Sequence, residues 1–260
     1  MQIPLFQVDC FTANRFAGNP AAVCPLDHWL PETTMQAIAA ENNLSETAFL
    51  VRRDDLYELR WFTPKAEVDL CGHATLAAAF VIFHLLETGE DTVRFHSPKS
   101  GSLSVSRQDD LLRLDFPSRP PEACPCPPDL AAGLGLEPAA VLQSTDYLAV
   151  FADEQQVIDL APDMKRLSRL DRRGVIVTAP GKRADFVSRF FAPRLGVDED
   201  PVTGSAHCTL IPYWSARLDR TSLHALQVSE RGGELFCRDL GDRVAIAGRA
   251  VLYLQGVISL

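Results

Sequence analysis

The chain has 260 residues, of which 47% are hydrophobic and 23% charged, a composition typical of a globular protein. Its formal net charge of −9 argues against nucleic acid or an anionic membrane surface as a partner. No apolar run approaches the roughly 20 residues of a membrane-spanning helix. No signal peptide is visible, and the seven cysteines include no CxxC pair. We therefore expect reduced thiols, a cytoplasmic location and no membrane partner.

Short β-rich runs dominate the chain, and helical patterns are few. A helix fits residues 33–43, with Thr33 or Thr34 as its N-cap. The alternation and content of apolar residues predict strands at 5–10, 47–51, 57–63, 92–96, 111–116, 174–178, 185–192 and from 251 to the end.

Two further stretches predict helices of different character. Residues 74–86 are apolar nearly all round, which is typical of a helix buried on every side. Residues 205–218 form a second apolar stretch that contains Pro212, so we expect a kink or an early end there. Many strands and one buried helix in each half predict an α+β fold, with a curved, mostly antiparallel sheet wrapped around each helix.

A proline-rich segment and an internal repeat divide the chain. Half of the residues in 117–128 are proline, which favours a linker at 118–128 between an N-terminal half, 1–117, and a C-terminal half, 118–260. The sequence Arg-Trp-Phe-Thr-Pro at 60–64 returns as Arg-Phe-Phe-Ala-Pro at 189–193. Each copy is followed by an acidic loop, a glycine and an apolar helical stretch. This shared order predicts two pseudo-symmetric halves.

The usual cofactor and metal motifs are missing from the sequence. It contains no GxGxxG, GxxxxGK[ST], GxSxG or HExxH pattern. A dinucleotide site, an NTP-phosphate site and a helix-borne pair of histidine ligands are therefore not supported by the sequence.

Three segments carry residues suited to acid–base chemistry. Glu46 lies between a predicted helix and an apolar strand, where neighbouring Ala48 and Phe49 would desolvate its carboxylate and suit it to act as a general base. The alternative is a surface carboxylate in a turn. Further along, Cys71-Gly72-His73 opens the first buried helix, where backbone N–H groups favour an anion. His73 could transfer a proton or simply cap the helix, and Cys71 could be reactive or a small buried residue.

The third segment, Asp200 to Ser205, repeats this arrangement before the second helix. Asp200 or Thr203 could be its N-cap. In the functional interpretation, the two helix N-termini face one cleft and hold a carboxylate-bearing substrate, with Glu46, His73 and Asp200 beside it.

These segments resemble the PhzF family of phenazine-biosynthesis-like isomerases. The matching stretches are 18–23, 43–49, 60–64, 67–78 and 200–206. The resemblance implies a diaminopimelate-epimerase-like fold of two similar halves with the active site between them, a homodimer, and no cofactor or metal. In such folds the last strand, here 251–260, can return to the first half. The resemblance places the catalytic residues at Glu46, His73 and Asp200, and the serine of the family at Ser205. We expect the substrate-binding residues to be Gly72, Gly204, Ser205, Cys71 and Thr203.

The implied reaction is an isomerisation in which Glu46 moves a proton between carbons of a small unsaturated carboxylic acid. Racemases of this fold use two cysteines, one before each buried helix. Here Cys71 stands before the first helix, but Thr203 stands before the second. A Cys/Thr pair also resembles hydroxyproline dehydratases. The alternatives are therefore a dehydratase or epimerase of an amino or imino acid that uses Cys71, or a metabolite-binding protein without catalysis. The stretch 43–49 favours the PhzF-like reaction.

Overall fold

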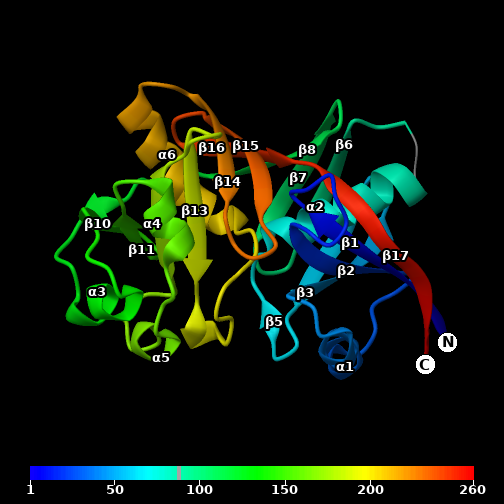
Figure 1. Cartoon of the computed structure of the whole chain (residues 1–260). Helices are drawn as coiled ribbons and strands as arrows, with labels where there is room; N and C mark the ends of the chain where they lie inside the picture. Colours follow the sequence, from blue (N-terminus) through cyan, green and yellow to red (C-terminus); the bar gives the residue numbers. More distant parts are fainter. Residues whose placement is uncertain (87–88) are drawn as a thin grey trace. The chain divides into compact units, whose positions relative to one another are not determined.

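The computed structural model describes residues 1–86 and 89–260 (Figure 1). It divides into two compact units: unit 1 comprises Met1–Asp115 with Ala247–Leu260, and unit 2 comprises Phe116–Ile246. Both units combine a mixed sheet with a few helices, as the α+β prediction requires. Within the described ranges, no helix is both long and apolar enough to cross a bilayer.

Unit 1 is a sheet of mostly antiparallel strands. Two strand pairs, β2–β3 and β4–β6, run parallel, whereas β1–β2, β1–β17, β3–β4, β6–β7 and β7–β8 run antiparallel. Its elements are β1 (Gln2–Cys10), β2 (Asn19–Leu26), α1 (Glu32–Asn42), β3 (Glu46–Arg53), β4 (Leu56–Phe62), β5 (Glu67–Val68), α2 (Gly72–Val81), the π-helical turn η1 (Ile82–Leu86), β6 (Thr92–Ser97), β7 (Gly101–Gln108), β8 (Leu111–Pro117) and β17 (Ala250–Ser259).

Helix α2 is the core of unit 1, as its apolar sequence predicted. Every residue from His73 to Ala79 is buried, and the helix packs against β1, β2, β3, β7 and β17 (Figure 1). An all-round apolar helix lowers its free energy when a sheet curves around it, because each buried methylene contributes about 0.8 kcal/mol.

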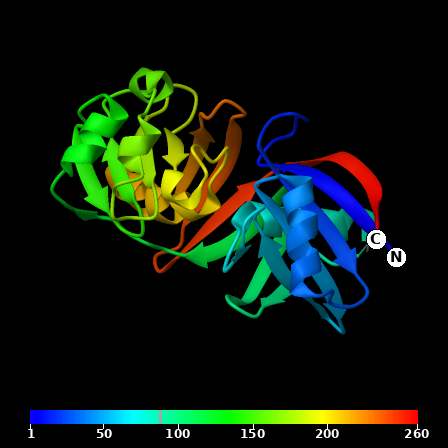
Figure 2. The same cartoon turned by 90° about the horizontal axis from the view of Figure 1, so that it is seen from below.

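The last strand lies beside the first. β17 pairs antiparallel with β1 over its whole length, from Gln2 opposite Ser259 to Cys10 opposite Ala250, and Figure 2 shows the two chain ends side by side. The amino group of Met1 donates a hydrogen bond to the carbonyl of Leu260 at 2.5 Å. The N-terminal unit is therefore built from both ends of the chain.

Unit 2 repeats the mixed pattern. The pairs β11–β12 and β13–β14 are parallel, and β9–β10, β10–β11, β12–β13 and β14–β15 are antiparallel. Helix α6 packs against β14 and β15. The elements are β9 (Glu122–Ala123), α3 (Pro128–Leu134), β10 (Ala140–Gln143), β11 (Tyr147–Val150), α4 (Glu154–Asp159), α5 (Met164–Leu167), β12 (Val175–Pro180), β13 (Phe186–Phe191), the 3₁₀ turn η2 (Pro193–Leu195), α6 (Gly204–Leu218), β14 (Ser222–Gln227), β15 (Gly233–Asp239) and β16 (Arg243–Gly248).

Helix α6 continues through its internal proline. Pro212 has no N–H with which to bond the carbonyl of Cys208, one turn earlier. The backbone N–H of Arg119 donates to that carbonyl instead, at 2.9 Å. The early end that the sequence allowed is therefore not found, and the helix reaches Leu218.

The order of elements around the repeated sequence is the same in both units. In unit 1, β3 pairs with β4 and places Thr47 opposite Phe62. In unit 2, β12 pairs with β13 and places Val175 opposite Phe191. A loop then leads to α2 or α6. Glu46 directly precedes Thr47 in unit 1, and Gly174 directly precedes Val175 in unit 2, so these two residues occupy corresponding positions.

The predicted helix at 33–43 forms as α1, but its start differs. The N-cap is Pro31, and its carbonyl accepts from Thr34 N at 2.9 Å and Met35 N at 3.1 Å. The threonine N-cap was therefore wrong, because Pro31 pre-sets an extended backbone from which Glu32 begins the first turn.

Candidate active site

Glu46 and His73 come together inside unit 1. Glu46 is the first residue of β3, where it lies opposite Ala21 of β2, and His73 lies in the first turn of α2. Glu46 Oε2 is 3.2 Å from His73 Nε2, and the two side chains are only 18% and 6% exposed. A carboxylate on a strand end thus contacts an imidazole on a buried helix.

Burial keeps the His73 imidazole neutral. It lowers the pKa of His73 from 6.5 to about 3, and a hydrogen bond to the backbone of Pro20 offsets only part of that effect. The contact with Glu46 therefore joins a carboxyl group to a neutral ring, which can both donate and accept a proton. On the other side of the ring, Asn19 Nδ2 lies 3.3 Å from Nδ1. Asn19 is fully buried at the start of β2 and holds the ring in place.

Cys71 lies on the same side of the ring as Asn19. Its Sγ is 3.5 Å from His73 Nδ1, and the residue is the N-cap of α2. Its side chain makes no capping hydrogen bond in the described structure, which leaves the positive end of the helix to other groups. Ligand atoms of Glu46, Cys71 and His73 lie within 4.8 Å of one another, so these three residues could together hold a divalent cation.

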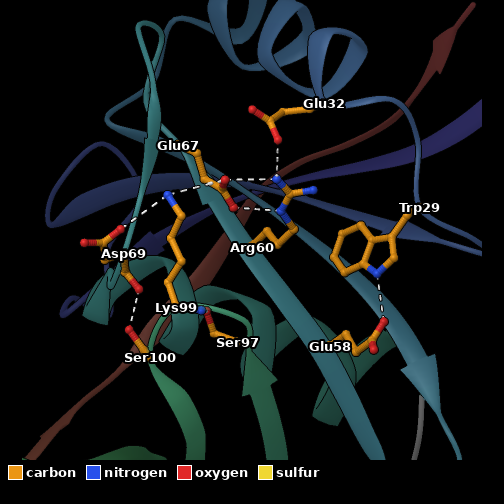
Figure 3. Close-up of polar contacts among 9 residues, drawn as sticks. All are labelled: Trp29, Glu32, Glu58, Arg60, Glu67, Asp69, Ser97, Lys99 and Ser100. Carbon is orange, nitrogen blue, oxygen red and sulfur yellow. Dashed lines mark hydrogen bonds and ion pairs between the residues drawn. The ribbon is translucent and has the colours of Figure 1, made fainter.

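A charged network fixes the loop that leads into α2 (Figure 3). Arg60 donates two hydrogen bonds to Glu67, Nε to Oε1 at 2.7 Å and Nη2 to Oε2 at 2.9 Å. Lys99 Nζ bridges Glu67 at 3.5 Å and Asp69 at 3.3 Å. The hydrogen bond from Arg60 lowers the pKa of Glu67. The acidic loop therefore serves to anchor the chain before the helix.

Unit 2 carries the corresponding charged pair. Arg189 donates Nε to Glu199 Oε1 at 2.7 Å and Nη2 to Oε2 at 2.9 Å. The guanidinium carbon of Arg189 lies 4.9 Å from the Phe191 ring, and that of Arg60 lies 5.2 Å from Phe62. The repeated sequence thus encodes the same anchor twice.

Asp200 and Thr203 are joined at the start of α6. Thr203 is the N-cap, and its hydroxyl donates to Asp200 Oδ2 at 2.6 Å. Gln227, which is 1% exposed, accepts from Thr203 N at 2.8 Å and donates to the carbonyl of Asp200 at 2.7 Å. The loop before α6 is therefore clamped by a buried amide from β14.

Ser205, the second residue of α6, contacts a partly buried ion pair. Arg173 Nη2 donates to Ser205 Oγ at 3.0 Å. The same guanidinium donates to Asp146, from Nε at 2.9 Å and from Nη2 at 2.5 Å. The hydrogen bond to Asp146 and its charge raise the pKa of Arg173 against the desolvation that lowers it.

The predicted residues therefore form one group in each unit. Unit 1 brings together Glu46, Cys71 and His73, with Gly72 as the first residue of α2. Unit 2 brings together Asp200, Thr203 and Ser205, with Gly204 as the first residue of α6. Four contacting residues were missed: Asn19, Asp146, Arg173 and Gln227. Asn19 lies inside the stretch 18–23 and had a signal there, whereas the other three lie far in sequence from their partners.

Structural comparison places the fold among epimerases and isomerases. A hydroxyproline epimerase from Agrobacterium vitis superposes with a TM-score of 0.63 at 12% identity, covering 100% of this chain and 93% of that one. At this identity the likeness concerns the fold alone. It agrees with the predicted diaminopimelate-epimerase-like architecture.

The family follows from closer matches. The family model described as phenazine biosynthesis-like protein, PhzC-PhzF, matches residues 8–256. An uncharacterized isomerase of Pseudomonas aeruginosa is 55% identical over 260 residues, with both chains fully covered. A PhzF family protein from Enterococcus faecalis has a TM-score of 0.98 at 50% identity, again with full coverage of both chains. The chain belongs to the PhzC-PhzF family, and it is an isomerase of the PhzF type.

Proposed function

We propose that the protein is a cofactor-independent isomerase that moves a proton between carbons of a small unsaturated carboxylic acid. Glu46 is the acid–base group: it removes the proton from carbon next to the unsaturated system and returns it to another carbon. His73 holds a polar group of the substrate and relays the proton. A positioned general base contributes about 10²–10⁴-fold to such a rate.

The observation that carries this proposal is the 3.2 Å contact between Glu46 Oε2 and the neutral ring of His73. A cationic imidazole at that distance would lower the basicity of the carboxylate, whereas a neutral imidazole does not. Asn19 fixes the ring from its other side, so the geometry is held before a substrate arrives.

We assign a supporting role to unit 2. Asp200 and Ser205 would bind polar groups of substrate, and the N–H groups near Gly72 and Gly204 would stabilise developing negative charge. Electrostatic stabilisation of this kind is often the largest single contribution to catalysis. Kinetic constants of Asp200→Asn and Ser205→Ala test these roles directly, since each should lose turnover while remaining folded.

The test of the reaction is deuterium exchange. Crotonate, sorbate, proline and alanine are incubated with protein in D₂O, and loss of C–H signals is followed by proton NMR. We expect exchange into at least one unsaturated acid by the wild type and a loss of at least 100-fold in Glu46→Gln. Glu41→Gln, an exposed carboxylate at the end of α1, is the matched control and should exchange at the wild-type rate. Full exchange by Glu46→Gln would contradict the proposal.

A second candidate rests on the 3.5 Å contact between Cys71 Sγ and His73 Nδ1. The imidazole could accept the thiol proton, which would allow a dehydratase or epimerase to act on an amino or imino acid. In that case Cys71→Ser abolishes turnover and iodoacetamide inactivates the enzyme. The corresponding position of α6 is Thr203, which has no thiol and whose hydroxyl donates a hydrogen bond to Asp200. A two-thiol mechanism is therefore not available.

We also propose that the protein is a homodimer. Strand β17 pairs with β1, and it carries exposed apolar side chains: Tyr253 is 43% exposed, Leu254 39% and Val257 59%. Apolar residues grouped on a strand of a sheet favour association with a second copy.

A further inference from the structure

The position of unit 2 that corresponds to Glu46 has no side chain. Gly174 precedes β12 as Glu46 opens β3, and a Cβ atom there would lie 2.5 Å from the Phe190 ring and 2.8 Å from the carbonyl of Phe191. Such distances are below any ordinary van der Waals contact, so a carboxylate cannot stand at this position. The repeat has therefore separated the chemistry of the two units.

Arg173, the preceding residue, provides the polar group instead. Its guanidinium carbon lies 5.3 Å from the centre of the Phe190 ring, which occupies the space that Gly174 leaves open. Asp146 accepts two hydrogen bonds from Arg173, and the Asp146 side chain is only 1% exposed. The aromatic face and the buried carboxylate together favour this orientation of the guanidinium.

This orientation determines what the Ser205 hydroxyl can do. An arginine N–H can only donate, so the 3.0 Å bond from Arg173 Nη2 makes Ser205 Oγ an acceptor. The hydroxyl hydrogen then points away from the guanidinium. Ser205 is thereby prepared as a hydrogen-bond donor to another group.

We propose that Arg173 is a positioning residue that fixes the Ser205 hydroxyl as a hydrogen-bond donor to an oxygen of the substrate. The assignment rests on the isomerase function proposed above. Arg173 acts through Ser205 and through no contact of its own with the reacting carbon. Asp146 shares this positioning role, because without Asp146 the guanidinium of Arg173 would lose two of its hydrogen bonds.

The test is a double-mutant cycle on the exchange reaction. The substrate is the acid of the panel that shows the fastest Glu46-dependent exchange, and kcat/KM is measured for wild type, Arg173→Gln, Ser205→Ala and the double variant. Ser205→Ala should lose about 10²–10³-fold, because a donor to developing charge contributes on that scale, and Arg173→Gln should lose no more than Ser205→Ala. The double variant should be no worse than the poorer single variant, and Arg173→Lys should fall between wild type and Arg173→Gln.

Two further variants serve as controls. Arg173→Gln leaves the buried Asp146 carboxylate without its cation, which could lower stability. Combining Asp146→Asn with Arg173→Gln removes this unpaired charge and should show the same loss of kcat/KM as Arg173→Gln alone. Arg172→Gln, which removes a neighbouring arginine bonded to Gln143, should match the wild type. Losses that multiply in the double variant, or an Arg173→Gln variant with wild-type kcat/KM, overturn this assignment alone. A panel with no Glu46-dependent exchange overturns the proposed function and this assignment with it.

Discussion

The hydroxyl of Thr75 donates a hydrogen bond to the backbone carbonyl of Cys71 at 2.6 Å. In the equivalent turn of unit 2, His207 Nδ1 donates to the carbonyl of Thr203 at 2.8 Å. Both bonds reach back from the helix to its N-cap residue. They fix the two positions at which racemases of this fold would carry cysteines.

Thr75→Val should therefore weaken unit 1. The substitution keeps the shape of the side chain, which is 1% exposed, and removes only the hydrogen bond to Cys71. We expect the free energy of unfolding to fall by about 1 kcal/mol, as measured by urea denaturation. Thr33→Val, at an exposed site in α1, should change it by less than about 0.5 kcal/mol. Equal effects of the two substitutions would contradict this role of Thr75.

The buried histidines should make stability depend on pH. Burial lowers the pKa of His73 to about 3 and that of His207 to about 4, from 6.5. Below pH 6.5 the unfolded chain binds protons that the folded chain refuses, so the free energy of unfolding falls as pH drops towards 4. Each histidine contributes up to about 1.4 kcal/mol per pH unit.

Urea denaturation of wild type and His207→Gln at pH 7, 6 and 5 isolates one histidine. The difference in unfolding free energy between the two proteins should shrink as pH falls. Thr33→Val, which changes no titratable group, should keep a constant difference from the wild type. A constant difference for His207→Gln would show that the folded protein accepts this proton.

Glu67→Gln should remove an anchor rather than a catalytic group. Glu67 is 13% exposed and accepts both bonds from Arg60, so we expect a loss of about 2 kcal/mol in unfolding free energy. Arg60 lowers the pKa of Glu67, and the stabilisation is therefore present above pH 4.5 and lost as pH falls through the lowered value. Glu199→Gln should cause a loss of similar size, whereas Glu90→Gln, an exposed site, should not. Loss of deuterium exchange in folded Glu67→Gln far beyond that of Glu199→Gln would argue for a direct catalytic role.

Metal ions should inhibit rather than activate. Under the proposed acid–base mechanism, EDTA leaves deuterium exchange unchanged. Zn²⁺ should inhibit, because Glu46, Cys71 and His73 offer ligand atoms within 4.8 Å and coordination would occupy the base. Cys71→Ser should weaken this inhibition, measured as the Zn²⁺ concentration that halves the exchange rate. Loss of exchange with EDTA that returns with added metal would refute the mechanism.

Val257→Asp should separate the proposed dimer. Val257 is 59% exposed on β17, and a charge there cannot be buried against a second copy without a partner. Light scattering after size exclusion should give twice the chain mass for wild type and the chain mass for the variant. Leu240→Asp, at an exposed apolar site in unit 2, should remain dimeric. A monomeric wild type would exclude the dimer.

The sequence predicted the elements that depend on local pattern. The buried helix α2 was visible from its apolar residues, and the strands before and after it from their β-branched and aromatic content. The prediction was wrong at the end of 74–86, because residues 82–86 form a π-helical turn in which Leu85 and Leu86 are exposed. That Glu46 and His73 lie near each other was expected from the functional interpretation of the two helix N-termini and from the family resemblance. Local pattern could not give the contact itself, because it depends on how α2 packs against β3.

Contacts made across long sequence separations were not predictable. Two examples are the hydrogen bond from Arg119 N–H to the carbonyl of Cys208 and the one from Arg173 to Ser205 Oγ. Each depends on strand register and packing that no local sequence pattern encodes. Pro212 shows this most clearly. By propensity it should end or kink α6, and a single backbone bond from another segment satisfies the carbonyl that it leaves without a partner.

The pairing of β17 with β1 has a consequence for synthesis of the protein. Unit 1 contains Ala247–Leu260, so all of unit 2 must leave the ribosome before unit 1 has its full set of strands. Until then, the edge of β1 that β17 covers stays open to other chains. Folding of unit 1 is therefore timed by the length of unit 2, and a circular permutant that joins Leu260 to Met1 would let unit 1 close as one continuous stretch.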